Sequence, residues 1–223
     1  MINHPNRSKF ESAEITQSQV IKLLGVIDAG LVKGVGNPIP GKMCVEAAVC
    51  FALGLPHGDD PKCVAPALRS LKIRLNDSHW SSNGARAKGL RRLAVIQLGS
   101  KGFLDEKEFI IKCAGLVTKT SVPLALRAVA SIHKDSAHAQ ALRDAANRCE
   151  IEGPRESALN ARDVAKKAGS YADAAYAAAA AYAAYAAYAR DKSLADFAEG
   201  IVQILIEMDV PGMRWLPLTE IAA

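Results

Sequence analysis

Residues 33–42, Lys-Gly-Val-Gly-Asn-Pro-Ile-Pro-Gly-Lys, contain the GxxxxGK pattern of phosphate-binding loops. A true loop of this class follows a strand, keeps its backbone N–H groups free and places a Ser or Thr after the lysine, where the hydroxyl binds magnesium. Here Pro38 and Pro40 remove two N–H donors, and Met43 stands where the hydroxyl is needed. We therefore expect no hydrolysis of nucleoside triphosphates at this loop.

A loop that leads into a helix can nevertheless bind an anion, because the first N–H groups of the helix are free and carry a partial positive charge. The apolar residues 43–53 predict a buried helix after the loop, so Asn37 and Lys42 are candidate ligand-binding residues. Glu46 lies one turn inside that helix. It either favours the helix N-terminus or is a buried acceptor for a ligand hydroxyl or an arginine. An ordinary loop remains the alternative.

A second candidate loop spans residues 76–84, Asn-Asp-Ser-His-Trp-Ser-Ser-Asn-Gly, and leads into another helix. Trp80 could stack on a planar group, and Ser82 and Asn83 lie beside it at the helix start. Arg86 falls on the apolar side of the helix, where its guanidinium could contact a phosphate or carboxylate in a bidentate manner. The alternative interpretation is an internal ion pair of Arg86 with Glu46 or an aspartate, with Trp80 in the core.

Other residue types that carry chemistry show no interpretable spacing. The segment His57-Gly-Asp-Asp60 and His79 match no metal-ligand template, and the sequence contains no GxSxG or HExxH motif. Five cysteines occur without a CxxC pair, which is typical of reduced, buried thiols. We expect no catalytic residue, no metal and no cofactor. A histidine-based enzyme that cleaves phosphodiesters remains an alternative.

The charge balance suits an anionic partner without requiring one. The formal net charge is +5. Lysines and arginines are concentrated in residues 62–101, where Asp77 is the only acidic residue. Because aromatic residues do not alternate with these charges, we do not expect nucleic-acid binding. We find no apolar run with the hydropathy of a membrane span and no apolar core of a signal peptide near the N-terminus. We therefore expect a cytoplasmic protein without a membrane partner.

Apolar residues recur at helical spacing and no segment alternates at period two, so we predict an all-α, multi-helix bundle. Thr16 and Gln19 form the pattern of a capping box. We expect two parts, a helical domain over 1–152 with the candidate ligand loops, and 153–223 with a long helix, a C-terminal helix and a tail. The helices of the first part are expected to begin near Thr16, Met43, Val64, Asn83, Asp105, Ser121 and Ser136.

Residues 170–190 form a tract of alanine and tyrosine in which Asp173 is the only charge before Arg190. Alanine is the best helix former, so the tract predicts a long Ala/Tyr-rich C-terminal helix. A helix so poor in charge must be covered by other residues. We interpret it either as a close-packed helix of the bundle or as the seam of a homo-oligomer, with the tyrosines at the contact.

Six segments of the chain form a recognisable combination, namely 40–50, 53–61, 72–77, 80–86, 197–208 and 211–216. Together they resemble a family of uncharacterised bacterial and phage proteins with alanine-rich C-terminal parts. The alanine-rich tract is also similar to those of some toxin-immunity proteins. Neither resemblance implies an activity or catalytic residues.

Together these observations predict a non-enzymatic, oligomeric binding protein that captures a small anionic ligand derived from a nucleotide. If the chain is encoded by a phage, it would act in anti-defence as a sponge for a host immune signal. Two alternatives remain open. One is a toxin-immunity protein that occludes a toxin with its Ala/Tyr helix, and the other is a hydrolase of a nucleotide signal.

Overall fold

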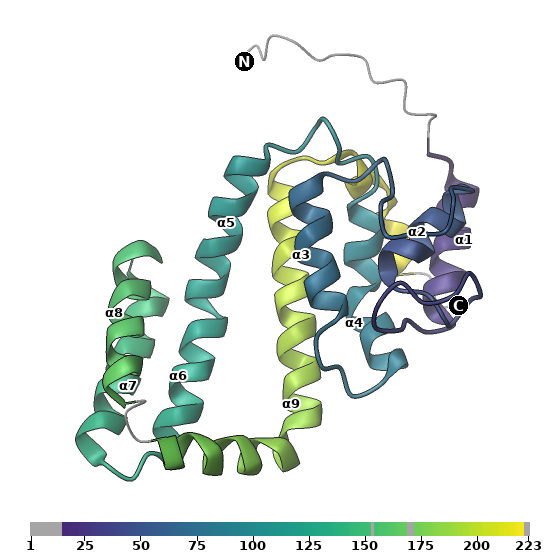
Figure 1. Ribbon diagram of the computed structural model, residues 1–223. Coiled ribbons are helices and arrows are strands. Elements are labelled where there is room, and N and C mark those ends of the chain that lie inside the picture. Colours follow the sequence, from purple (N-terminus) through teal and green to yellow (C-terminus); the bar gives the residue numbers. More distant parts are fainter. Residues whose placement is uncertain (1–14, 153, 169–171, 221–223) are drawn as a thin grey trace, which may run out of the picture. The chain divides into compact units, whose positions relative to one another are not determined.

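The computed structural model describes residues 15–152, 154–168 and 172–220, and within these ranges the chain is all-α, as predicted (Figure 1). The described residues form no β-strand, and their only β-type pairing is an isolated antiparallel bridge between Gly36 and Met43. The elements are α1 (Gln17–Asp28), α2 (Val45–Leu53), α3 (Pro66–Asn76), α4 (Asn83–Ile96), α5 (Glu106–Lys119), α6 (Ser121–Ile132), α7 (Ser136–Ile151), α8 (Pro154–Ala168), α9 (Ala172–Glu207) and the 3-10 helix η1 (Pro211–Thr219).

The chain divides into two compact units. One unit contains the described residues up to Ile110 and those from Leu194 onward, and the other contains the described part of 111–193. The domain boundary expected near residue 153 falls between α7 and α8, which pack together within the second unit. The candidate ligand loops both belong to the first unit.

Local side-chain contacts fix where the helices of the first unit begin. Thr16 and Gln19 form the predicted capping box, in which each side chain accepts a hydrogen bond from the backbone N–H of the other residue. Ser82 caps α4 through its hydroxyl. Cys44 caps α2 through its sulfur, which accepts from the N–H of Ala47 at 3.3 Å. The sequence analysis did not predict a cysteine in this role.

Helix α2 is the central helix of the first unit. Its residues from Val45 to Cys50 are all buried, and it packs against α1, α3 and α4. The sequence-based prediction of a helix that is apolar on nearly every side is thereby confirmed. Glu46 is a buried carboxylate in this otherwise apolar helix.

Two arginines of α4 hold the C-terminal segment on the first unit. Arg91 binds Asp28 of α1 at 2.8 Å and also donates to the carbonyl oxygen of Thr219. Arg92 binds Glu199 of α9 at 3.1 Å and Glu220 at 2.5 Å. These two members of the basic run are thus paired with acidic residues of the same unit.

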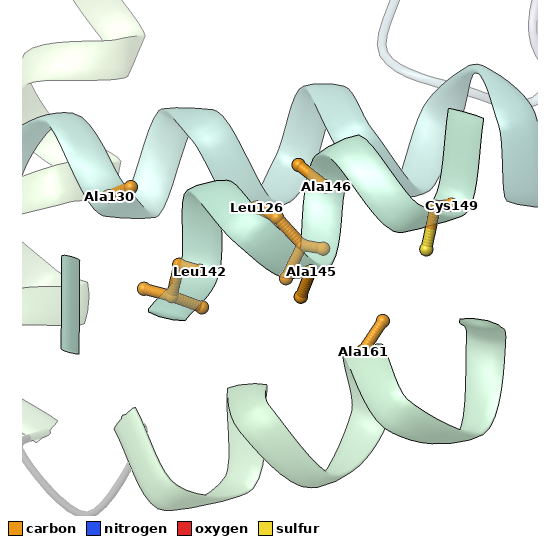
Figure 2. Close-up of a cluster of buried hydrophobic side chains, with 7 residues drawn as sticks. All are labelled: Leu126, Ala130, Leu142, Ala145, Ala146, Cys149 and Ala161. Carbon is orange, nitrogen blue, oxygen red and sulfur yellow. The ribbon is translucent and has the colours of Figure 1, made fainter. Parts of the chain in front are cut away.

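The second unit contains a small three-helix core. Helices α6, α7 and α8 pack together around small side chains, among which Ala145, Ala146 and Cys149 are fully buried (Figure 2). Ala161 of α8 faces this cluster. Small residues at these positions allow the helix backbones to approach closely.

Helix α9 extends over Ala172–Glu207, but its side chains are described only from residue 190 onward, a stretch of about 18 residues. From Leu194 this stretch belongs to the first unit, where Ala198, Ile201 and Leu205 are buried. The side chains of the Ala/Tyr tract are not among those that the structure describes. The prediction of a long helix with a buried tyrosine stripe is therefore not confirmed.

One helical stretch, Glu106–Ile132, is long and apolar enough to cross a membrane by length and composition. A single stretch of this kind, interrupted by Lys112, Lys119 and Arg127, is weak evidence, and the absence of a membrane partner stays a prediction. A core helix of a soluble protein meets the same criteria.

Candidate ligand-binding site

The two candidate loops lie side by side in the first unit. The N–H of Leu31 donates to the carbonyl oxygen of Asn83 at 3.2 Å. The N–H of Gly34 donates to Oδ1 of Asp77 at 2.9 Å. The segments around residues 31–35 and 76–83, far apart in the sequence, therefore form one local structure.

Asn76, the last residue of α3, connects three segments of this structure. Its Oδ1 accepts a hydrogen bond from the N–H of Val45, the first residue of α2, at 3.2 Å. Its Nδ2 donates to the carbonyl oxygen of Val32 at 3.0 Å and to Oδ1 of Asp77 at 2.9 Å. Because the side chain is buried and its oxygen and nitrogen both have partners, Asn76 positions the first loop against the start of α2.

A pocket of ≈ 130 Å³ opens between the first loop, the start of α2 and the end of α3. Its polar lining consists of three carboxylates, one amide and one thiol, and no lysine or arginine is among the described residues that line it. The lining residues are Gly34, Val35, Cys44, Val45, Glu46, Asp59, Ile73, Asn76 and Asp77.

Glu46 lines this pocket and is paired with Lys72 of α3. The Lys72 Nζ to Glu46 Oε1 distance is 3.0 Å, and both side chains are 0% exposed. The contact is an ion pair whose angles do not meet those of a hydrogen bond, and Oε2 has no hydrogen-bond partner among the residues that the structure describes. Burial raises the pKa of Glu46 and lowers that of Lys72, and the mutual attraction of the two groups opposes both shifts.

The N-terminus of α2 has fewer free donors than the sequence analysis expected. The N–H of Val45 is bound to Asn76, and that of Ala47 is bound to the sulfur of Cys44. These hydrogen bonds use two of the groups that an anion would need. Burial, the main influence on the Cys44 thiol, raises its pKa, which disfavours the thiolate that a nucleophile requires.

Arg86 and Trp80 are buried and hold the loops together. Arg86 donates from Nε to the carbonyl oxygen of Asn76 and from a terminal nitrogen to that of Leu31, both at 2.8 Å. It also donates to Oδ1 of Asn83 at 2.9 Å. Trp80 donates from Nε1 to the carbonyl oxygen of Leu75 at 2.9 Å. The tryptophan is thus in the core, as one alternative proposed, but the arginine binds carbonyl and amide oxygens rather than an acidic residue.

The other predicted residues lie at the edge of this structure. Ser82 is exposed, and its hydroxyl accepts from the N–H of Ala85. Asn37 and Lys42 are both exposed, and the N–H of the former donates to the carbonyl oxygen of the latter at 2.7 Å. Of the seven predicted site residues, Glu46 alone lines the pocket.

Four residues of the lining lie in or next to segments named from the sequence but were not selected as site residues. Asn76 and Asp77 begin the second candidate loop, and Asp59 belongs to the His-Gly-Asp-Asp turn. Ile73 lies one turn before Asn76 on α3, so helical spacing would have placed it on the same face.

Among the described residues, no group of three or more His, Cys, Asp or Glu side chains is arranged to hold a metal ion. The carboxylates of the pocket are therefore not a metal centre. Comparison of this chain with known protein families, curated proteins and solved structures finds no match.

Proposed function

We propose that the chain is a ligand-binding protein and that the pocket between the first loop, α2 and α3 is its binding site. The observation that carries this proposal is the Glu46 carboxylate, which borders the pocket and has an oxygen without a hydrogen bond among the described residues. An unsatisfied buried polar atom costs about 1–3 kcal/mol, and more when it is charged. Because that oxygen has almost no accessible surface, a ligand in the pocket would donate to it only after a shift of the lining side chains.

The size of the pocket limits the ligand. An apolar cavity of about 150 Å³ holds a molecule as large as benzene, and pockets for drug-sized ligands measure about 300–1,000 Å³. A pocket of ≈ 130 Å³ therefore suits a small molecule or one terminal group of a larger one. The anionic, nucleotide-derived ligand expected from the sequence is a weaker proposal, because Lys42 does not line the pocket and Arg86 already has three acceptors.

A thermal-shift screen of the wild type and of Ile73→Trp tests the proposal. Ile73 is half-buried and lines the pocket, so a larger side chain should fill it. The library should contain amines, alcohols, carboxylates and nucleotides. Compounds that stabilise the wild type but not Ile73→Trp support the proposal. The control Ser70→Trp changes an exposed position of the same helix outside the lining, and it should retain the shifts.

Compounds that stabilise all three proteins equally would mean that binding occurs elsewhere. A screen without any pocket-dependent compound would contradict the proposed function.

We also propose that the Ala/Tyr tract forms an oligomer seam. Its support comes from the sequence, because residues 174–189 carry no charge, and exposed apolar surfaces of that kind usually mark interaction sites. Size-exclusion chromatography with light scattering tests it. A monomeric wild type would contradict it.

A further inference from the structure

We infer that the pocket binds the protonated amine or guanidinium group of a small molecule, with Glu46, Asp59 and Asp77 around the cation. This inference rests on the proposed function and names the ligand class of the same site. It depends on three features of the lining, namely its charge, its hydrogen-bonding capacity and its volume.

The charges of the lining favour a cation. Glu46, Asp59 and Asp77 line the pocket together, and among the described residues no lysine or arginine does. Lys72 does not line the pocket, but its Nζ lies 3.0 Å from Glu46 Oε1 and compensates the charge of that carboxylate. Asp59 and Asp77 have no ion-pair partner within the described part of the chain. An anionic ligand would meet these carboxylates at close range, which is unfavourable.

The hydrogen-bonding groups of the lining also favour a ligand that donates. Three donor groups that border the pocket are already used: the N–H of Gly34 binds Asp77, the N–H of Val45 binds Asn76, and the amide nitrogen of Asn76 binds Val32 and Asp77. The acceptors are in surplus. Among the described residues no donor makes a hydrogen bond to Glu46 Oε2, and the half-buried Asp59 carboxylate also lines the pocket.

A ligand that satisfies these acceptors must bring N–H or O–H donors. Ammonium and guanidinium groups carry several donors and no acceptor, so they match this surplus better than a neutral alcohol does. The carboxylates are not arranged to hold a metal ion, which favours an organic cation whose donors are spread over a larger group. The ≈ 130 Å³ volume accommodates such a group with a short alkyl chain beside Ile73 and Val35.

Isothermal titration calorimetry with the full chain tests this inference. The probes are butylamine and agmatine as cations, butan-1-ol as a neutral molecule of similar shape, and AMP as an anion, all at the same pH and ionic strength. We expect saturable binding of at least one cation and none of butan-1-ol or AMP.

Two neighbouring aspartates provide matched variants. Asp59→Asn removes a carboxylate of the lining, and we expect it to weaken cation binding about tenfold, which corresponds to about 1.4 kcal/mol. Asp60→Asn makes the same change one residue away, at a carboxylate that is exposed and paired with Lys62 and Arg69 outside the lining. We expect this variant to bind within twofold of the wild type.

The outcomes separate this inference from the proposed function. Pocket-dependent binding of AMP or butan-1-ol without cation binding would overturn the cation class and leave the binding site in place. Equal effects of Asp59→Asn and Asp60→Asn would assign cation binding to diffuse surface charge and overturn the inference. Absence of binding by both cations would also overturn it, while the library screen with Ile73→Trp decides independently whether the pocket binds anything.

Discussion

Lys72 Nζ lies 3.0 Å from Glu46 Oε1, and neither side chain is exposed to solvent. The pair joins α2 to α3 beneath the pocket. Moving two charges out of water is costly, and their attraction repays this cost only when further hydrogen bonds satisfy the remaining atoms. Here Glu46 Oε2 has none within the described residues. A pair with this geometry is therefore expected to contribute little net stability.

The first prediction follows from this cost. Lys72→Met should destabilise the fold by about 3 kcal/mol, because it leaves the buried Glu46 without a counter-ion. The double variant Glu46→Leu/Lys72→Met should recover most of that stability, because it removes both desolvation costs. Urea unfolding followed by circular dichroism measures both effects. Additive losses in the double variant would contradict this description of the pair.

The stability of the single variant Lys72→Met should depend on pH. Burial raises the pKa of Glu46 above its ordinary value of 4.5, so in Lys72→Met the folded state binds a proton more tightly than the unfolded state. The contribution of the protonated Glu46 carboxyl to the free energy of unfolding is then fully present below pH 4.5. It is lost as the pH rises through the folded-state pKa. The destabilisation relative to wild type should therefore be larger at pH 8 than at pH 5.

The second prediction concerns Arg86. Its removal leaves the buried carbonyl oxygens of Asn76 and Leu31 without a donor. Arg86→Ala should therefore cost about 3 kcal/mol of unfolding free energy. Lys88→Ala, at an exposed position of the same helix, should change it by less than about 0.5 kcal/mol. Chemical unfolding of the two variants provides the comparison, and similar values would show that Arg86 does not hold the loops together.

The third prediction compares two glycines with left-handed backbones. Gly36 has φ of 73°, and a Cβ there would lie 2.1 Å from the carbonyl oxygen of Lys42. Gly34 has φ of 67°, and a Cβ there would meet nothing within 4 Å. Gly34→Ala should cost about 1 kcal/mol through backbone strain alone, and Gly36→Ala about 3 kcal/mol. Thermal unfolding tests the difference, and equal melting temperatures would contradict the described loop.

The fourth prediction concerns alkaline pH. Burial raises the pKa of the Cys50 thiol from 9.0 to about 11, so the folded state retains a proton that the unfolded state releases in this range. Its contribution to stability is complete below pH 9 and is lost as pH rises toward 11, by up to about 1.4 kcal/mol per pH unit. Cys50→Ala should reduce the slope of unfolding free energy against pH over this range. An unchanged slope would show that the thiol is not desolvated.

Helix boundaries in this chain are determined locally, which is why the sequence analysis predicted the all-α fold. The Thr16 capping box and the apolar helix after residue 43 were both recognisable, because capping and hydrophobic spacing involve residues close in the sequence. The contact between the two candidate loops was not predicted, because it depends on hydrogen bonds between segments far apart in the sequence. The pairing partner of Glu46 was not, because Lys72 is 26 positions away on another helix.

The use of each polar side chain could not be read from local patterns. Arg86 has the position expected of a ligand-binding residue, yet its donors are directed to carbonyl oxygens that the fold brings next to it. Asn76 and Asp77 have no motif that distinguishes them from a turn, and they become pocket residues because the first loop folds back on α3. Such roles depend on contacts between distant segments.

The most direct test of the central claim, that this pocket binds a small organic cation, is an NMR titration of the ¹⁵N-labelled chain with butylamine and, separately, with agmatine, of which at least one should bind. The amide signals of Gly34, Val35 and Val45, which line the pocket, should shift in a saturable manner with one shared dissociation constant. Signals of the α6–α8 core, such as that of Ala146, should not move. Shifts that do not saturate, or that concentrate away from the three pocket amides, would contradict the claim.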